Sequence, residues 1–327
     1  MKKTLLLDTS VTTFNRGDEI IMECTRKELA QLLEKTFEVT LPTHVSPFHW
    51  YQVLRNSLYV QQIANCDYKF VGGSNVLVPN LLTHFPQWNI NLFNYQPMKG
   101  CVLVGVGAGA GAEGKLDKYT TYLYKHLLSR EFYHSVRDER SKQYVERLGL
   151  KAINTGCVTM WMLTPEFCKK IPTQKADKVV FTITASQSPK MIESTRQMIE
   201  ILKRNYHELT FWPQGIDDLD QFNSFNGVES IRVLPSSKQA YDYYLTNNDT
   251  DYVGTRLHGG VYAMRHMRRA IIIAIDERAR SINESNNLNC ISMDQMDDLD
   301  AYINQSIITD IRMDYDSILE WKKQFGL

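Results

Sequence analysis

Apolar and polar positions along the chain repeat one order: a short apolar run, then a longer stretch with apolar residues at helical spacing. In the first half, the apolar runs predict strands at 4–8, 68–71, 101–106 and 132–136. Helical spacing predicts helices at 19–35, 116–128 and 139–148. Strands that alternate with helices are typical of a parallel sheet covered by helices, so this half is predicted to be an α/β domain.

The same order starts again in the second half. Predicted strands lie at 178–184, 209–212, 231–234, 251–253 and 270–275, and predicted helices at 188–204, 236–246, 261–267 and 315–325. A polar stretch at 169–178 separates the halves. We therefore predict two Rossmann-like α/β domains, 1–170 and 171–327, with a cleft between them. The last helix is a candidate to pack back on the N-terminal domain.

Composition narrows the classes of function. Lys plus Arg equals Asp plus Glu, at 37 each, and this neutral balance argues against a dedicated nucleic-acid-binding protein. The six cysteines form neither CxxC pairs nor clusters with zinc spacing, which favours a reducing, cytoplasmic compartment. No apolar run approaches the roughly 20 residues of a membrane span, so any membrane contact is expected to be peripheral.

The sequence Gly-Thr-Arg-Leu-His-Gly-Gly at 254–260 is the most informative motif, because it joins a predicted strand to a predicted helix. On an extended link, Arg256 and His258 point the same way, since side chains alternate with a period of two. Gly259 lets a ligand approach the backbone, and the helix start offers N–H groups to an anion. The motif therefore predicts an anionic substrate that undergoes proton transfer.

Two other charged segments also follow predicted strands. Arg137 precedes a predicted helix that Asp138 is placed to cap. Arg137 is interpreted either as a bidentate clamp for phosphate or carboxylate, or as the partner of Asp138 in a structural ion pair. In the charged segment 276–280, Arg280 is a candidate anion ligand, and a solvated loop is the alternative.

Polar residues near the ends of two early strands are candidate ligands for a sugar. Asn15 and Asp18 could hydrogen-bond a hydroxyl, whereas the alternative for Asp18 is to cap a helix that begins at Glu19. Gly73 and Ser74 lie in a glycine-rich loop of the kind that cradles phosphates. That loop and a second one at 105–111 lack the Walker lysine and the dinucleotide spacing, so tight turns explain both equally well.

Taken in chain order, these motifs resemble the polysaccharide pyruvyl transferase family. The resemblance is carried by Asn15-x-Gly17-Asp18-Glu19, Gly72-Gly73-Ser74, Val136-Arg137-Asp138-Glu139-x-Ser141, Gly156-Cys157, Gly254-Thr255-Arg256-Leu257-His258-Gly259 and Asp276-x-Arg278-x-Arg280. It implies a fold similar to the two-domain GT-B glycosyltransferases. It also implies that a pyruvyl group moves from phosphoenolpyruvate to a sugar as a ketal, with no metal and no cofactor beyond this co-substrate.

The resemblance also implies roles for the residues. His258 is the expected general acid, because imidazole can hold and deliver a proton near neutral pH. The expected donor ligands are Arg256, Arg137, Arg280 and Gly259. The expected acceptor ligands are Asn15, Asp18, Gly73 and Ser74, which puts the acceptor side in the N-terminal domain. The sugar would belong to a bacterial-type surface polysaccharide or its precursor, free or lipid-linked, at the inner face of the cell membrane.

Two alternatives remain open. A GT-B-type glycosyltransferase that uses a nucleotide sugar needs an acidic residue for the ribose and a slot for the base, and Trp212, Asp217 and Asp218 are candidates. A non-catalytic glycan-binding protein of the same fold would not need Arg256 and His258 in register. Release of inorganic phosphate from phosphoenolpyruvate distinguishes the three.

Overall fold

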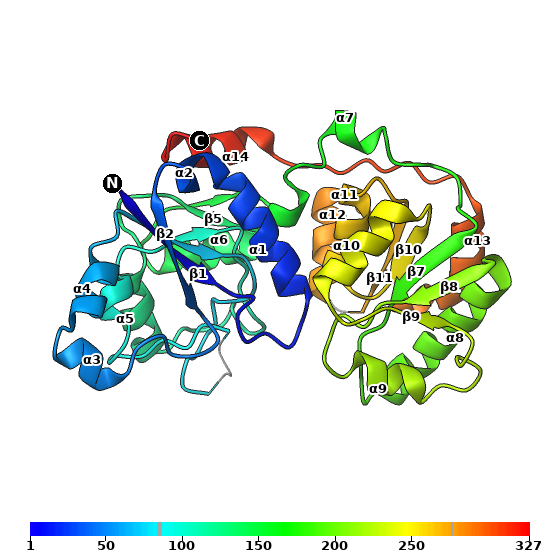
Figure 1. The fold of residues 1–327 in the computed structure, drawn as a ribbon, viewed down its shortest axis with the longest axis horizontal. Coiled ribbons are helices and arrows are strands. Elements are labelled where there is room, and N and C mark those ends of the chain that lie inside the picture. The colour runs from blue at the N-terminus through cyan, green and yellow to red at the C-terminus, as the bar shows by residue number, and fades with distance from the viewer. Residues whose placement is uncertain (84–86, 276) are drawn as a thin grey trace. The chain divides into compact units, whose positions relative to one another are not determined.

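The computed structural model describes residues 1–83, 87–275 and 277–327, without the side chains of residues 277–281. By its internal contacts the chain divides into two compact units (Figure 1). Unit 1 comprises Met1–Thr13, Ile21–Trp161 and Asp314–Leu327, and unit 2 comprises Phe14–Ile20 and Met162–Met313. The chain thus passes into unit 2 after Trp161, before the boundary predicted at residue 170.

Unit 1 is built on a parallel sheet in the order β2-β1-β3-β4. The strands are β1 Lys3–Asp8, β2 Phe37–Pro42, β3 Tyr68–Gly72 and β4 Val102–Val104, followed by the parallel pair β5 His134–Val136 and β6 Ala152–Asn154. The helices are α1 Gly17–Glu28 (in part), α2 Ala30–Leu33, α3 Trp50–Leu54, α4 Leu58–Ala64, α5 Lys118–Leu127, α6 Glu139–Arg147 and α14 Tyr315–Lys323. The strand order reverses between β1 and β3, and in open α/β sheets ligands bind at such a reversal.

Alternation along β1 divides the apolar residues between the two faces of this sheet. Leu5 and Leu7 belong to the core cluster that contains Val60 and Ile63 of α4 and Leu123 of α5. Helices α3 to α5 group on one side of the sheet, and α1 and α14 lie on the other (Figure 1). The last helix, α14, belongs to unit 1, where its Trp321 donates a hydrogen bond to the carbonyl of Tyr133 at 2.9 Å.

A buried histidine connects β5 to β4 through its side chain. His134 is fully buried; its Nδ1 accepts the N–H of Leu103 at 3.2 Å, and its Nε2 lies 3.0 Å from the carbonyl of Ser129. These partners require a neutral ring with its proton on Nε2, because a proton on Nδ1 would meet the Leu103 N–H. Burial accordingly lowers the pKa of His134 from its ordinary 6.5 to about 4.

This histidine makes the stability of the protein dependent on pH. Below pH 6.5 the unfolded chain binds a proton that the folded ring does not, so the contribution is complete above pH 6.5 and is lost as the pH falls toward 4. We expect the free energy of unfolding to fall by about 3 kcal/mol over this window from His134 alone. Urea titrations across the window measure it, and the slope should be shallower in His134→Gln. An equal slope in both proteins would refute the assignment.

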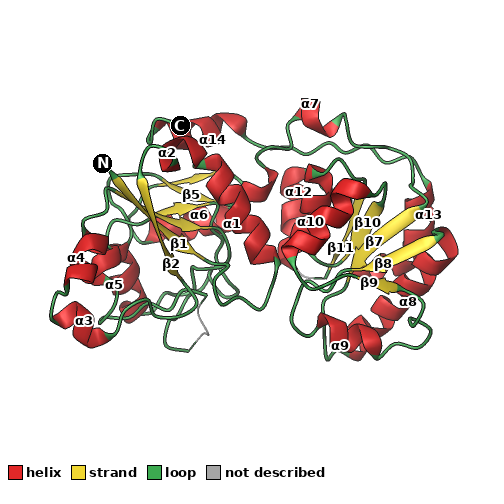
Figure 2. Ribbon diagram, viewed as in Figure 1, coloured by secondary structure: helices red, strands yellow, loops and turns green. Residues whose placement is uncertain are grey.

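Unit 2 is a six-stranded parallel sheet in the order β12-β11-β10-β7-β8-β9. The strands are β7 Lys178–Thr182, β8 Glu208–Phe211, β9 Arg232–Val233, β10 Asp251–Gly254, β11 Ala270–Ala274 and β12 Cys290–Ser292. The helices are α7 Pro165–Cys168, α8 Pro189–Asn205, α9 Asp218–Asn223, α10 Lys238–Asn247, α11 Leu257–Arg265, α12 Glu277–Asn286 and α13 Leu299–Asn304. Helices cover both faces of this sheet, with α10 to α12 on one side and α8 and α13 on the other (Figure 2).

The strand order of unit 2 is that of a doubly wound Rossmann sheet, and it reverses between β7 and β10. The prediction of two Rossmann-like α/β domains is therefore confirmed. One predicted boundary near the motif at 254–260 was wrong. The helix predicted at 261–267 is α11, and it begins at Leu257.

Candidate active site

The motif at 254–260 lies where the strand order of unit 2 reverses. Arg256 follows β10, and Ile183 follows the neighbouring strand β7. The Nε of Arg256 donates to the carbonyl of Ile183 at 3.1 Å, and the hydroxyls of Thr184 and Thr255 lie 2.9 Å apart. The two loops are thus tied together at the place where α/β sheets bind their ligands.

Arg256 forms a bidentate ion pair with Asp218, the first residue of α9. Its Nη2 lies 2.5 Å from Oδ1 and its Nε 3.1 Å from Oδ2. The carboxylate is fully buried and also accepts the N–H groups of Ala185 at 3.1 Å and Gly215 at 2.6 Å. Such a fork fixes the plane of the guanidinium, while 19% of the arginine side chain remains exposed.

The extended link between Arg256 and His258 was a wrong prediction. Arg256 is the N-cap of α11, and His258 lies inside the first turn of that helix. The argument from a period of two therefore does not apply, although both residues stay at the junction of β10 and α11 and both are partly exposed. The backbone of Arg256 is held by the hydroxyl of Tyr252, which donates to its carbonyl at 2.7 Å.

The two glycines of the motif allow close packing of the helix on the sheet. A Cβ on Gly260 would lie 2.8 Å from both Ile272 Cγ1 and Tyr252 Cε1, and one on Gly259 would lie 2.9 Å from Gln214 Oε1. Because neither glycine interrupts the helix, α11 starts four residues earlier than predicted. A direct contact of Gly259 with the donor stays a prediction.

Gly260→Ala is expected to destabilise unit 2 by about 1–3 kcal/mol, the range for an overpacked core, since a methyl group there meets ring and aliphatic atoms that are themselves buried. Thermal unfolding measures the loss. Gly109→Ala is the matched control, because the nearest atom to its Cβ would be at an ordinary 3.6 Å. Equal melting temperatures for the two variants would contradict this packing role.

Asn15 lies in unit 2, with the motif at 254–260, rather than with the N-terminal domain where it was predicted. It pairs with Gly215 in an isolated antiparallel bridge. Its Oδ1 accepts the N–H of Gly17 at 3.0 Å and the Nε2 of Gln214 at 2.9 Å. The Oε1 of Gln214 is buried with no hydrogen-bond partner among the described residues, on the side of Gly259.

Asp18 belongs to the same segment, Phe14–Ile20, and is almost completely buried. It lies in the first turn of α1, which begins at Gly17 rather than at the predicted Glu19. Asp18 therefore does not cap a helix from Glu19, and that alternative was wrong. Its predicted contact with a sugar acceptor remains a prediction.

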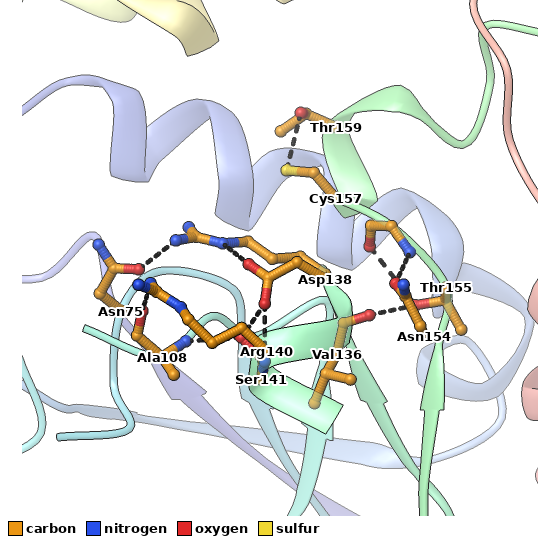
Figure 3. Close-up of polar contacts among 12 residues, drawn as sticks. Asn75, Ala108, Val136, Asp138, Arg140, Ser141, Asn154, Thr155, Cys157 and Thr159 are labelled. Carbon is orange, nitrogen blue, oxygen red and sulfur yellow. Dashed lines mark hydrogen bonds and ion pairs between the residues drawn. The ribbon is translucent and has the colours of Figure 1, made fainter. Parts of the chain in front are cut away.

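A polar cluster in unit 1 contains Asn75, Asp138 and Ser141 (Figure 3), and Arg137 contacts the first two of them. Its Nη2 lies 2.5 Å from Oδ1 of Asn75, and its Nε lies 3.3 Å from Oδ2 of Asp138. The other oxygen of Asp138 caps α6, because it accepts the N–H of Ser141 at 2.7 Å. The structural ion pair is thus present, and a donor contact of Arg137 stays a prediction.

The two glycine-rich loops lie next to this cluster and leave room for its arginine. A Cβ on Gly107 would lie 2.2 Å from the guanidinium carbon of Arg137, so only glycine leaves room for that side chain. Gly73 and Ser74 both have left-handed backbones, at φ +44° and +60°. The hydroxyl of Ser74 donates to Oε1 of Gln87 at 2.5 Å, and its carbonyl accepts the N–H of Gly107 at 2.8 Å. Tight turns explain both loops, and acceptor binding by Gly73 and Ser74 remains a prediction.

Two of the three residues that suited a nucleotide sugar are engaged in other contacts. Trp212 is fully buried and stacks on Tyr241 at 3.9 Å, so its faces are not open to a base. Asp218 is paired with Arg256. Asp217 is exposed and lines a pocket of about 420 Å³ together with residues of the loop after β7 and of α9.

The structure does not describe two of the predicted site features. The side chain of Arg280 lies outside the described residues, and so does Asp276.

In the part of the chain that the structure describes, no group of three or more His, Cys, Asp or Glu side chains could hold a metal ion. Over the same residues, no helix combines the length and the apolar character needed to cross a bilayer.

Three residues that shape the site were missed in these roles by the sequence analysis. Asp218 fixes Arg256, Gln214 joins Asn15 to the start of α11, and Asn75 holds Arg137. Each follows or lies near the end of a strand: Gln214 follows β8, and Asn75 follows β3. Their position after strands was the available signal, but their partners lie between 38 and 199 residues away.

Comparison with known proteins identifies one family. The model of the polysaccharide pyruvyl transferase family matches residues 15–277, which include both polar clusters. Among curated protein sequences, none matches this chain.

Two of the solved structures with a similar fold were both determined with bound UDP. UDP-GlcNAc 2-epimerase of Methanocaldococcus jannaschii, solved with UDP-GlcNAc and UDP, superposes with a TM-score of 0.55 at 11% identity, over 100% of each chain. MnaA of S. aureus, solved with UDP, superposes with a TM-score of 0.54 at 10% identity, over 94% of this chain and 92% of its own. At this identity the likeness concerns the fold alone, and it agrees with the predicted GT-B-like class.

Proposed function

The chain belongs to the polysaccharide pyruvyl transferase family, a family of transferases, and from this premise we propose that it moves a pyruvyl group from phosphoenolpyruvate to a sugar as a ketal. The observation that carries the proposal is that Arg256 and His258 both lie at the strand reversal of unit 2. There a guanidinium fixed by Asp218 lies one turn or less from an imidazole at a helix start. This combination suits an anionic substrate that must be protonated.

In the proposed reaction, His258 donates a proton to the methylene carbon of phosphoenolpyruvate. The adjacent carbon becomes electrophilic, and a sugar hydroxyl adds to it and loses its proton. Phosphate then leaves with the C–O bonding electrons, and a second hydroxyl of the same sugar closes the ketal. The products are the pyruvylated sugar and inorganic phosphate, so atoms and charges balance.

Arginines are the proposed ligands of the two anionic groups of the donor. Arg256, Arg137 and Arg280 are assigned to its phosphate and carboxylate, because a guanidinium binds either group through two parallel hydrogen bonds. Gly259 lies at the start of α11, where backbone N–H groups favour an anion. Asn15, Asp18, Gly73 and Ser74 are the proposed ligands of the sugar.

The acceptor in this proposal is a sugar of a surface polysaccharide or of its precursor, free or lipid-linked. The reaction would take place in the cytoplasm at the inner face of the membrane, where phosphoenolpyruvate is supplied by metabolism. We assign no role to nucleic acid, to a metal or to a further cofactor.

The test is the release of inorganic phosphate from phosphoenolpyruvate when candidate acceptor sugars are added. The proposal expects phosphate release that depends on both substrates, together with a product heavier than the acceptor by one pyruvyl ketal. Release of a nucleotide from a sugar nucleotide would instead identify a glycosyltransferase. Saturable sugar binding with no release from either donor would identify a glycan-binding protein.

A further inference from the structure

Unit 1 exposes a group of large apolar side chains on α3, at the start of α4 and in two loops. We refer to it as the apolar face. It consists of Val45, Trp50, Tyr51, Leu54, Leu58, Tyr59, Leu92 and Phe93, all exposed. Four of them have between 61% and 76% of their surface exposed: Trp50, Leu54, Leu58 and Phe93. Single exposed apolar residues are ordinary, but a group of this kind marks an interaction surface.

Contacts within unit 1 hold the segments of the apolar face together. Asn94 donates from Nδ2 to the hydroxyl of Ser46 at 2.9 Å, and the N–H of Asn89 donates to the carbonyl of Thr43 at 2.7 Å. These bonds join the loop after β2 to the loop that carries Leu92 and Phe93. The ring of Phe48 lies 5.8 Å from that of Tyr59, so the same loop also contacts α4.

The charges around the apolar face are unusual for this chain. Residues 39–112 contain one acidic residue, Asp67, in a protein that has 37 in its 327 residues. Asp67 accepts the N–H of Lys3, so it lies at the amino ends of the strands, whereas the loop that starts the apolar face follows the carboxyl end of β2. Arg55 lies exposed between α3 and α4.

We infer that the apolar face docks this protein on an anionic lipid surface. A protein partner can pair each carboxylate with a cation of its own, whereas an anionic membrane repels every carboxylate that faces it. The absence of acids over 39–66 therefore fits a membrane better than a protein partner or a second copy of the chain. Trp50, Tyr51 and Tyr59 are the residue types that prefer the membrane interface, and leucines supply the apolar area that enters it.

Vesicle binding by the full chain tests this inference, and Trp50 is a built-in probe. The other four tryptophans are at most 4% exposed: Trp88, Trp161, Trp212 and Trp321. We expect co-sedimentation with vesicles of phosphatidylcholine and phosphatidylglycerol in equal parts, and a blue shift of tryptophan emission that is lost in Trp50→Phe. Failure to co-sediment with these vesicles would overturn the inference.

Matched variants make the test specific. The triple variant Trp50→Ser, Leu54→Ser and Leu58→Ser should lower the affinity for these vesicles by at least about tenfold. The reason is that binding scales with the apolar area that enters the lipid. Its control is Tyr243→Ser, Ile308→Ser and Leu319→Ser, which removes exposed apolar side chains elsewhere. An equal loss in the control, or a dimer that the first triple variant dissociates, would contradict a lipid-docking face.

The charge of Arg55 provides a separate check. Arg55→Glu places a carboxylate where none occurs, so it should weaken binding to the phosphatidylglycerol vesicles more than Arg55→Gln does. Identical binding by these two variants would contradict the choice of an anionic surface. None of these measurements uses phosphoenolpyruvate or a sugar, so the docking inference and the proposed reaction can fail independently.

Discussion

Replacement of His258 by alanine is expected to lower turnover of phosphoenolpyruvate by about 10²–10⁴-fold, the range for loss of a general acid. His258 is partly exposed in the first turn of α11, and alanine is the residue with the highest helix propensity. The fold should therefore survive, and circular dichroism with a melting curve checks this. Single-turnover release of inorganic phosphate measures the chemical step directly.

His266 provides the control on the same helix. It is the C-cap of α11, and its Nε2 lies 3.1 Å from Asp242, at the opposite end of the helix from the motif. His266→Ala should retain turnover within a few-fold of the native protein. If His258→Ala is equally active, the imidazole is not the acid, and the proton must come from another group.

Removal of Arg256 alone is expected to lower the free energy of unfolding by about 3–5 kcal/mol, because it leaves the buried carboxylate of Asp218 without its counter-charge. Two backbone N–H groups would still contact that carboxylate, which places the expected loss near the lower end of the range. Arg256→Met is the suitable variant, since it keeps most of the volume of the side chain. Urea titration gives the value.

The double variant Arg256→Met and Asp218→Leu separates structure from catalysis. It removes both charges but leaves the N–H groups of Ala185 and Gly215 without this acceptor, so stability should recover in part relative to Arg256→Met. If Arg256 also binds the donor, turnover should stay low in this stable protein, and the KM for phosphoenolpyruvate should rise. Recovery of turnover together with stability would show that Arg256 has only a structural role.

Much of the architecture could be predicted because it depends on local patterns. Strands such as β1 and β7 are runs of apolar residues, and an amphipathic helix such as α8 shows its period directly. The capping of α6 by Asp138 also follows from neighbouring residues. These local features were enough to predict the α/β class and to place the candidate residues after the strands.

The details of the site were less predictable because they depend on close approach between distant segments. The Gly259-Gly260 pair was interpreted as a gap for a ligand, but Tyr252 and Ile272 occupy the space beside it. The glycines of 105–111 suggested a phosphate loop, but at Gly107 the room is taken by the guanidinium of Arg137. A glycine in sequence shows only that space is needed, and the structure shows what fills it.

The sequence by itself determined the alternation of strands and helices, the neutral charge balance, the lack of acids over 39–66 and the motif with Arg256 and His258. The tertiary structure decided which groups those residues meet. Arg256 is held by a carboxylate 38 residues away, and Asn15 by an amide 199 residues away. Local periodicity carries no information about such pairs, because they form only when the sheet brings the ends of its strands to one edge.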